Sequence, residues 1–310
     1  MRPNTCVIYN PAAGRGRAVL AVGRLRRRFS GVEFRPTSHS GHAIELARRA
    51  ASEGFARVVA AGGDGTAHEV ANGLLASGNR DVVFAAWPVG SMNDYAFTCG
   101  LANWPVVREP LTVVTADVLR VRVDGAECYA VNGVGVGFNG AVTVESQHLH
   151  RLRGHALYAS AFLLAAARRF SKPVVRVELD GMVSVGPLLA LSVSVGQREG
   201  GFRLFPAAKL DDGLADTLRL GGIQRYELPR HLPGLLAGRL PTHPQLTTGR
   251  CTMARLTSDA GICVHADGEI IRRPDNAPTN VQIEVMPRHL RVEVCPTRMP
   301  TVCGPTRGRG

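Results

Sequence analysis

The chain has 310 residues, of which 45% are hydrophobic and 5% aromatic, a composition typical of a globular protein long enough for two domains. No apolar run approaches the roughly 20 residues that cross a bilayer, which excludes a helical membrane-spanning protein. The formal net charge of +12 favours phosphate-bearing partners, but dispersed arginines and scarce aromatic residues argue against nucleic acid.

The first hundred residues alternate between apolar strands and amphipathic helices. The expected strands are 6–9, 32–35, 58–61 and 82–87, and the expected helices are 18–28, 43–52 and 67–76. This alternation is typical of a parallel sheet, which binds ligands at the carboxyl ends of its strands. We therefore expect an α/β domain over residues 1–112, with its site at that edge.

From Asp117 the pattern changes to many short strands rich in Val and Leu, with one helix near 155–170. Turn pairs such as Asp124-Gly125 and Asp180-Gly181 indicate hairpins. We expect an antiparallel β-sandwich-like domain over residues 113–295, with the active site in the cleft between the domains. Residues 296–310, rich in Pro, Gly and Arg, are expected to form a disordered basic tail.

The segment Gly62-Gly63-Asp64-Gly65-Thr66 follows a buried strand and opens a helix. Glycines let the backbone bend tightly, and the N–H groups at a helix start favour phosphate. Thr66 and Glu69 have the spacing of a capping box. Asp64 would repel a phosphate unless it holds Mg²⁺ or takes a proton, which indicates phosphoryl transfer. A plain turn with Asp64 as a cap is the alternative.

Further motifs extend this pattern along nearly all of the chain. In order, they are Asn10–Gly16, Gly62–Thr66, Gly90–Asp94, Asp117, Asn132–Phe138, Leu210–Leu214 and Asp267–Glu269. Together they resemble the diacylglycerol kinase catalytic domain family, which includes bacterial lipid kinases, sphingosine kinases and ceramide kinases. The resemblance implies an α/β domain like that of NAD kinases and diacylglycerol kinases, followed by a β-sandwich-like domain.

The resemblance also implies that ATP binds in the first domain. The implied nucleotide-binding residues are Asn10, Pro11, Gly14, Thr37, Gly62, Gly63, Asp64, Gly65, Thr66, Ala67, His68, Gly90, Ser91 and Asn93. Ser91 keeps the hydroxyl of the family's usual threonine. Met92 replaces a glycine, so a side chain stands where glycine permits a positive φ and close approach of the ligand.

Glu269 lies in a turn that the sequence alone predicts to be a plain hairpin. In bacterial members of the family, the matching glutamate accepts the proton of the lipid hydroxyl. The resemblance implies that Asp64 and Asp94 organise the catalytic Mg²⁺ and the nucleotide, and it places Asp267 in the same catalytic group. Glu269, Asp64, Asp94 and Asp267 are therefore the expected catalytic residues.

The segment Leu210–Leu214 resembles the family's structural Mg²⁺ loop. Lys209 and Leu214 would offer carbonyl oxygens and Asp212 a carboxylate, which are the hard oxygen ligands that Mg²⁺ prefers. Asp-Asp-Gly is also an ordinary turn sequence, so a turn without a metal is the alternative.

The resemblance implies a cytoplasmic kinase that transfers the γ-phosphoryl group of ATP to diacylglycerol at the inner face of the cell membrane. An anionic membrane fits the net charge. Phosphatidylglycerol, ceramide or a sphingoid base remains open as acceptor, and so does a homodimer. NAD kinases share the Gly-Gly-Asp-Gly-Thr loop, but the Asn-Glu motif that follows in them is not found after 82–87. A non-catalytic lipid- or nucleotide-binding relative is the other alternative.

Overall fold

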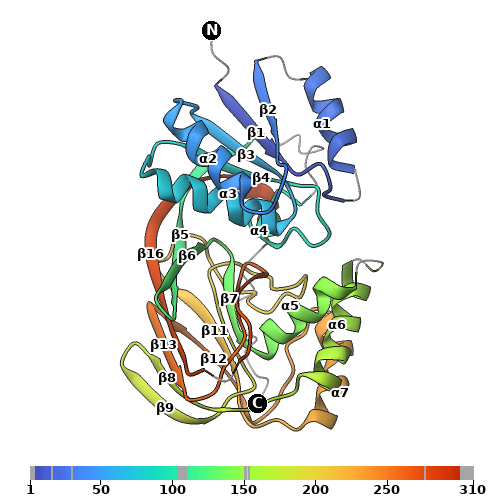
Figure 1. Ribbon diagram of the computed structural model, residues 1–310, viewed down its shortest axis with the longest axis vertical. Coiled ribbons are helices and arrows are strands. Elements are labelled where there is room, and N and C mark those ends of the chain that lie inside the picture. Colours follow the sequence, from blue (N-terminus) through green and yellow to red (C-terminus); the bar gives the residue numbers. More distant parts are fainter. Residues whose placement is uncertain are drawn as a thin grey trace.

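Figure 1 shows a computed structural model of the chain, which describes residues 4–14, 17–28, 31–102, 110–149, 152, 154–275 and 277–300. The chain forms two lobes along the long axis of the molecule. The N-terminal lobe, at the top of Figure 1, is built from residues 4–102, and the C-terminal lobe lies below it. The last strand runs back from the second lobe to the first.

The N-terminal lobe is a parallel sheet in the strand order β2-β1-β3-β4, flanked by helices. Its strands are β1 (Thr5–Tyr9), β2 (Val32–Pro36), β3 (Arg57–Gly62) and β4 (Val83–Pro88), and its helices are α1 (Arg17–Arg28), α2 (His42–Ser52), α3 (Asp64–Ser77) and α4 (Asp94–Thr98). The buried runs Cys6–Ile8 and Val58–Ala61 form the middle of the sheet. The predicted α/β fold is confirmed, although α3 begins earlier than expected, at Asp64.

The C-terminal lobe contains two antiparallel layers of strands. The first layer belongs to the same ten-stranded sheet and holds β5 (Thr112–Val123), β6 (Ala126–Ala130), β8 (Val174–Leu179), β9 (Met182–Pro187), β13 (Met253–Ser258) and β16 (Thr279–Val294). The second is six-stranded, in the order β12 (Leu246–Cys251), β11 (Ala215–Leu220), β10 (Ala190–Ser194), β7 (Gly133–Gly137), β14 (Val264–Ala266) and β15 (Glu269–Arg272). Buried aliphatic side chains from both layers form one core, which confirms the expected sandwich.

Three helices cover the six-stranded layer, on the right of Figure 1: α5 (Phe138–His148), α6 (Gly154–Arg168) and α7 (Leu228–Leu236). Their buried faces form a separate apolar cluster around Phe138, Phe162 and Leu232. The sequence predicted α6 but not α5 or α7. No helix among the described residues is long and apolar enough to cross a membrane.

Strand β16 belongs to both lobes. It pairs with β5 along its length, and near its end Val292 pairs in parallel with Phe84 of β4. Val292 and Val294 are buried in the core of the N-terminal lobe, so the end of the expected second domain, 113–295, packs into the first lobe. Apolar side chains near the end of β16 complete the hydrophobic core of the N-terminal lobe. Their burial there stabilises the return of the strand to this lobe.

The chain stays folded after β16, contrary to the expected disorder from residue 296. Pro296–Arg298 forms a short 3-10 helix, and the Cys295 N–H donates to the Cys99 carbonyl at 2.9 Å. The Gln197 side chain also donates to the Pro300 carbonyl at 3.3 Å. The rest of the predicted tail, 301–310, lies outside the described residues.

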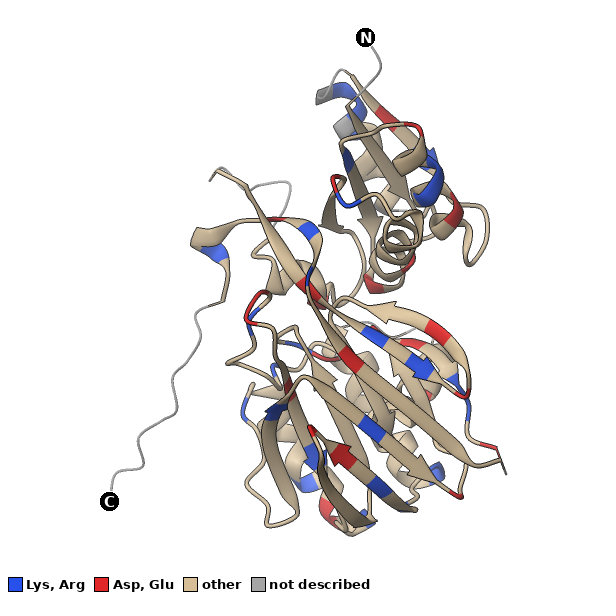
Figure 2. Cartoon of the chain, turned by 90° about the vertical axis from the view of Figure 1, so that its left-hand side faces the viewer, with Lys and Arg blue, Asp and Glu red and all other residues tan. Residues whose placement is uncertain are grey.

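The open face of the ten-stranded sheet carries charges of both signs, as Figure 2 shows. Arg120 pairs with Glu284 across two neighbouring strands, and Arg255 pairs with Glu178 at 3.2 Å. Within each pair the opposite charges neutralise each other locally.

Candidate functional site

The loops after β3 and β4 are in direct contact. The Gly62 carbonyl accepts the N–H groups of Val89 and Gly90 at 2.9 and 3.0 Å. A Cβ added to Gly90 would lie 2.3 Å from the Gly63 Cα, so only glycine fits there. Two of the predicted glycine motifs therefore form one continuous backbone surface at the edge of the sheet.

Asp64 and Asp94 lie at the centre of this surface. Asp64 accepts the Asn93 N–H at 2.9 Å and the Tyr95 N–H at 3.4 Å, and thereby caps the short helix α4. Both carboxylate oxygens of Asp94 accept the Gly201 N–H, at 3.1 and 3.0 Å. Asp94 thus connects the N-terminal lobe to a turn of the C-terminal lobe.

The surroundings of this pair favour a cation. Burial raises the pKa of Asp64, although backbone N–H groups oppose the shift. Burial also raises the pKa of Asp94, and the charge of Asp64 raises it further. Two neighbouring carboxylates in a buried site are the hard, anionic oxygens that Mg²⁺ prefers. The residues at this position therefore fit the expected catalytic Mg²⁺.

The Met92 side chain does not strain this loop. The left-handed position is taken by the next residue, Asn93, with φ 55°, and Met92 is absent from the described non-glycine residues with positive φ. The Met92 side chain packs against the other lobe, where a Cβ added to Gly201 would lie 2.1 Å from its Cε. The Met92 side chain therefore points to the Gly201 turn, and its backbone does not need the positive φ that glycine permits.

Asp267 holds the tip of the β14–β15 hairpin in place. Its two carboxylate oxygens accept the N–H groups of Val131, Asn132 and Gly133 at 2.9–3.0 Å, and one of them lies 2.9 Å from His68 Nδ1. Four donors occupy this carboxylate, so it positions the hairpin, and the expected catalytic role of Asp267 stays a prediction.

Helix α3 joins the two lobes through two polar contacts. Burial opposes protonation of His68, but the hydrogen bond to Asp267 and the charge of Glu269 outweigh it and raise the pKa of His68. One turn further on, the Asn72 side chain accepts the Tyr129 N–H and donates to the Tyr129 carbonyl, both at 2.9 Å. His68, expected at the nucleotide, therefore contacts the hairpin.

The predicted capping box of Thr66 and Glu69 is wrong. Because α3 begins at Asp64, Thr66 lies inside its first turn, against Gly62. The Glu69 carboxylate accepts the N–H groups of Gly41 and Ala43 at 2.8 and 3.1 Å, and so caps α2.

A polar pocket lies beside the start of α3, with an empty volume of about 980 Å³ including its open mouth. Its lining residues are Asn10, Pro11, Ala12, Thr37, Ser38, His39, Ser40, Gly65, Thr66, Glu69 and Glu269. Six of these were expected at the site: Asn10, Pro11, Thr37, Gly65, Thr66 and Glu269. Gly14 and Ser91 are not in this lining. The sequence missed Ser38–Ser40, although a polar run directly after a strand was the available signal.

A second, largely apolar cavity begins at Asp64, Ala67 and Asp94 and extends into the C-terminal lobe. Its empty volume is about 1340 Å³ including its mouth. The apolar side chains of its lining include Phe138, Val142, Tyr158, Phe162, Leu204, Leu218, Leu220, Ile223, Leu228, Leu235, Leu240 and Leu246. They come from the sheet and from α5, α6 and α7, so the helices that the sequence missed form one wall of the cavity.

The two spaces meet at two short segments. At the start of α3, Asp64 lines the apolar cavity and Gly65 lines the polar pocket. In the hairpin, Gly268 lines the apolar cavity and Glu269 the polar pocket. The segments touch, because a Cβ added to Gly65 would lie 2.3 Å from Glu269 Oε1. Asp64 and Glu269 therefore stand at the boundary between a polar and an apolar site.

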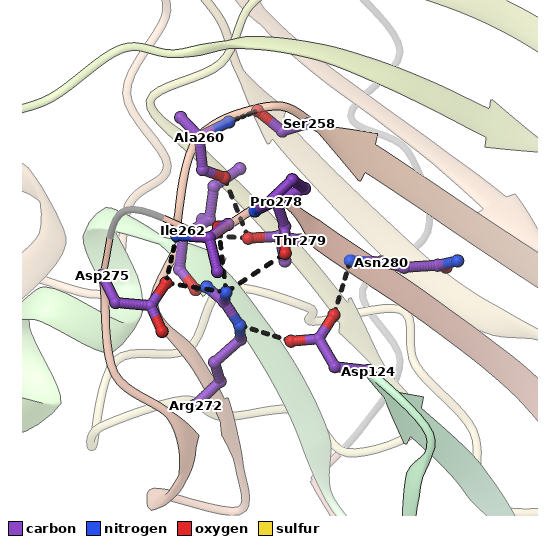
Figure 3. A network of polar contacts seen from close by, with 10 residues as sticks. Asp124, Ser258, Ala260, Ile262, Arg272, Asp275, Pro278, Thr279 and Asn280 are labelled. Atoms are coloured by element: carbon purple, nitrogen blue, oxygen red, sulfur yellow. Dashed lines mark hydrogen bonds and ion pairs between the residues drawn. The ribbon is translucent and has the colours of Figure 1, made fainter.

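Arg272 fixes the base of this hairpin, as Figure 3 shows. Its buried guanidinium donates to the Asp275 carboxylate at 2.8 Å and to the Ile262 carbonyl at 3.3 Å, and it pairs with Asp124 at the β5–β6 turn. The hairpin is thus held at its base by Arg272 and at its tip by Asp267, which limits the movement of Glu269.

Two side chains from other elements contact the loop Leu210–Leu214, which was predicted to bind a structural metal. Asp212 lies 3.6 Å from Arg250, whose guanidinium supplies the positive charge that a cation would bring. Asp117 accepts the Gly213 N–H at 2.7 Å and fixes the loop from the other side. Arg250 and Asp117 hold this loop, and a Mg²⁺ site at Lys209, Asp212 and Leu214 stays a prediction beside the alternative of a plain turn.

Both lobes of the chain are similar to known proteins. Residues 4–124 match the diacylglycerol kinase catalytic domain model, and residues 132–294 match the YegS C-terminal NAD kinase beta sandwich-like domain. A "Probable lipid kinase YegS-like" of Pseudomonas aeruginosa is 30% identical over 97% of both chains, and the diacylglycerol kinase of Bacillus subtilis is 27% identical over 85% of this chain and 88% of its own. The fold is similar to that of a diacylglycerol kinase from Bacillus anthracis, with a TM-score of 0.68 at 21% identity, covering 95% of this chain and 98% of that one.

Proposed function

The chain belongs to the family of YegS-like and diacylglycerol kinase-like lipid kinases, and we propose that it transfers the γ-phosphoryl group of ATP to the hydroxyl of diacylglycerol. The observation that carries this proposal is the meeting of the polar pocket and the apolar cavity at Asp64 and Glu269. A lipid kinase must bring a highly charged nucleotide and an apolar acceptor to one point. A polar pocket that meets an apolar cavity is suited to these two ligands.

In the proposed reaction, ATP occupies the polar pocket, with its phosphates toward the N–H groups at the start of α3. The hydroxyl oxygen of the lipid attacks the γ-phosphorus, the bond from that phosphorus to the ADP oxygen breaks, and the hydroxyl proton passes to Glu269. Asp64 and Asp94 would hold Mg²⁺, which supplies positive charge to the phosphate oxygens when bound. Asp267 and Arg272 keep Glu269 in position.

The apolar cavity is the proposed site for the acyl chains. It begins beside Asp64 and Asp94, so a lipid hydroxyl at its opening lies close to the transferred group. We also propose that the protein works as a peripheral protein on the inner face of the membrane. Its net charge of +12 would attract anionic lipid there.

The test is a transfer assay with radiolabelled ATP against diacylglycerol, phosphatidylglycerol, ceramide and a sphingoid base in mixed micelles, with NAD as a soluble acceptor. Products are separated by chromatography. We expect labelled phosphatidic acid from diacylglycerol. Label on NAD, or on no acceptor at all, would contradict the proposal.

Asp64→Asn is the matched variant for this assay. It should still fold, as urea unfolding would show, and lose turnover by at least about a hundredfold, the scale of losing one preorganised charged group. Asp81→Asn removes the same charge from an exposed turn of the same lobe and should leave turnover unchanged. Wild-type turnover in Asp64→Asn would show that this carboxylate has no part in transfer.

A further inference from the structure

Helix α7 and the short 3-10 helix η1 (Arg225–Glu227) before it expose apolar side chains to solvent. Tyr226, Pro229, Pro233 and Leu236 are spaced by three and four residues, so they lie on one face of the segment. All four are exposed, Tyr226 to 68% and Leu236 to 39%. We call these four residues the outer stripe of α7.

The opposite face of α7 is also apolar. Leu228 and Leu232 are buried, and Leu228 and Leu235 line the apolar cavity. A helix on the surface of a globular protein normally carries polar residues on its outer face. Helix α7 instead forms a wall, about 10 Å thick, with the apolar cavity on one side and an exposed apolar stripe on the other.

Positive side chains flank the outer stripe. Arg225, Arg230 and Arg239 are exposed, and Glu227 is the one acidic residue between positions 224 and 240. The Arg230 guanidinium lies over the Tyr226 ring, with its Cζ 5.8 Å from the ring centre. Apolar side chains flanked by arginines are typical of helices that lie in the interface of an anionic bilayer.

The positive charge extends to the segment after α6. Arg225 and Lys172 both lie over the Phe170 ring, with Cζ at 5.4 Å and Nζ at 5.6 Å from its centre. Glu227 Oε1 lies 3.6 Å from His243 Nε2, so a histidine of the same lobe stands beside the acidic residue. The charge around the stripe therefore complements anionic lipid.

Helix α1 carries a second exposed apolar pair beside arginines. Val19 and Leu20 are 49% and 68% exposed, and Arg24 and Arg27 are exposed on the same helix. The two helices lie at opposite ends of the long axis of the molecule (Figure 1). The described residues of α1 do not line the apolar cavity, whereas α7 joins an exposed apolar face to it.

Resting on the proposed lipid kinase function, we propose that the outer stripe of α7 is the surface that docks on an anionic lipid bilayer. Tyr226 and Leu236 enter the acyl region, and Arg225, Arg230 and Arg239 bind the lipid phosphates. The docked bilayer then lies against the wall of the acyl-chain cavity, which shortens the path of an acyl chain from the membrane to the cavity.

The test measures by sedimentation how the full chain partitions onto vesicles of equimolar phosphatidylcholine and phosphatidylglycerol, with vesicles of phosphatidylcholine alone alongside. Tyr226→Ser with Leu236→Ser removes the apolar contact. Arg230→Gln with Arg239→Gln removes two charges. None of these four residues lines the polar pocket or the apolar cavity.

Val19→Ser with Leu20→Ser makes the matched change on α1 and serves as the control. Urea unfolding midpoints show whether each variant is folded, and turnover on a short-chain diacylglycerol dissolved as monomers shows whether the site is intact. Both should be unchanged in all three double variants, because the replaced side chains are exposed.

We expect each α7 double variant to partition onto the anionic vesicles roughly ten- to thirtyfold more weakly, the scale of losing two arginines or two partly inserted apolar side chains at a membrane surface. The α1 variant should bind like the wild type. In the wild type, addition of anionic vesicles should slow amide hydrogen exchange over residues 225–239.

Unchanged vesicle binding in both α7 variants would overturn the proposal. Protection of residues 225–239 by self-association in the absence of vesicles would also overturn it, because the stripe would then bind a second copy of the chain. If no lipid is phosphorylated, the lipid kinase proposal fails, and vesicle partition and hydrogen exchange still decide whether α7 docks on a bilayer.

Discussion

Replacing Asp267 with asparagine should destabilise the fold, because its carboxylate faces four donors. The amide oxygen of asparagine can serve two of these donors. The amide nitrogen is itself a donor, so it would face the other two without a hydrogen bond. The variant therefore loses about two hydrogen bonds to a buried, charged acceptor.

Each such bond contributes roughly 1.5 to 3 kcal/mol, so the free energy of unfolding should fall by roughly 3 to 6 kcal/mol. The matched control is Asp180→Asn. Asp180 has the same left-handed turn conformation, with φ 46° against 51° for Asp267, and is also followed by glycine. Because the Asp180 turn is exposed, water replaces the lost bonds there, and the control should cost about 1 kcal/mol or less.

Urea unfolding followed by circular dichroism measures both variants, with turnover recorded in parallel. The expected result is a lower midpoint for Asp267→Asn, with turnover restored when saturating nucleotide stabilises the folded state. If Asp267→Asn unfolds at the wild-type midpoint and has lost turnover, Asp267 acts in the reaction itself. The positioning role derived from its four donors would then be wrong.

Three further results are expected. Glu269→Gln should leave ATP affinity nearly unchanged and lower kcat by roughly two to four orders of magnitude, the usual contribution of a positioned base, whereas a plain turn residue would tolerate the change. Gly73→Ala should destabilise the fold by roughly 1 to 3 kcal/mol in thermal unfolding, because the new Cβ would lie 2.3 Å from the Ile44 carbonyl oxygen. The control, Gly23→Ala, places its Cβ in open space within a helix and should stabilise the fold by up to about 1 kcal/mol. Vesicle sedimentation should require anionic lipid and weaken steeply with salt, and salt-resistant binding to zwitterionic vesicles would contradict the electrostatic proposal.

The parallel half of the fold could be predicted closely from the sequence. Its strands are continuous apolar runs and its helices are amphipathic, so each element has a distinct local pattern. The start of α3 was placed late because Asp64 and Gly65 read as loop residues. A helix can begin on them because Gly63 lets the backbone turn before the helix. A negative side chain such as Asp64 is also favourable in the first turn of a helix.

The helices α5 and α7 have no such pattern. The run Val142–Val144 in α5 is β-branched and reads as a strand, and α7 contains Pro233. Packing against the six-stranded layer stabilises both helices, and that contact is absent from the local sequence. The acceptor cavity that they line could not be predicted for the same reason.

The sequence identified the motifs of the site but not the contacts that each of their residues makes. Asp64 and Glu269 are at the boundary of the two spaces. Asp267 and His68 instead contact each other from positions 199 residues apart, which no spacing rule can reveal.

The antiparallel pair of β5 and β16 is the covalent connection between the lobes, and it has a mechanical consequence. Any change in the angle between the lobes has to bend or twist this two-stranded ribbon. The weak point of the ribbon is the bulge between Met286 and Leu290, where Arg288 adopts φ 50°. Asp117 accepts the Arg288 N–H at 2.8 Å and also holds Gly213, so it clamps the bulge against the loop that carries Asp212. Asp117 therefore stabilises the bulge against a change in the angle between the N-terminal and C-terminal lobes.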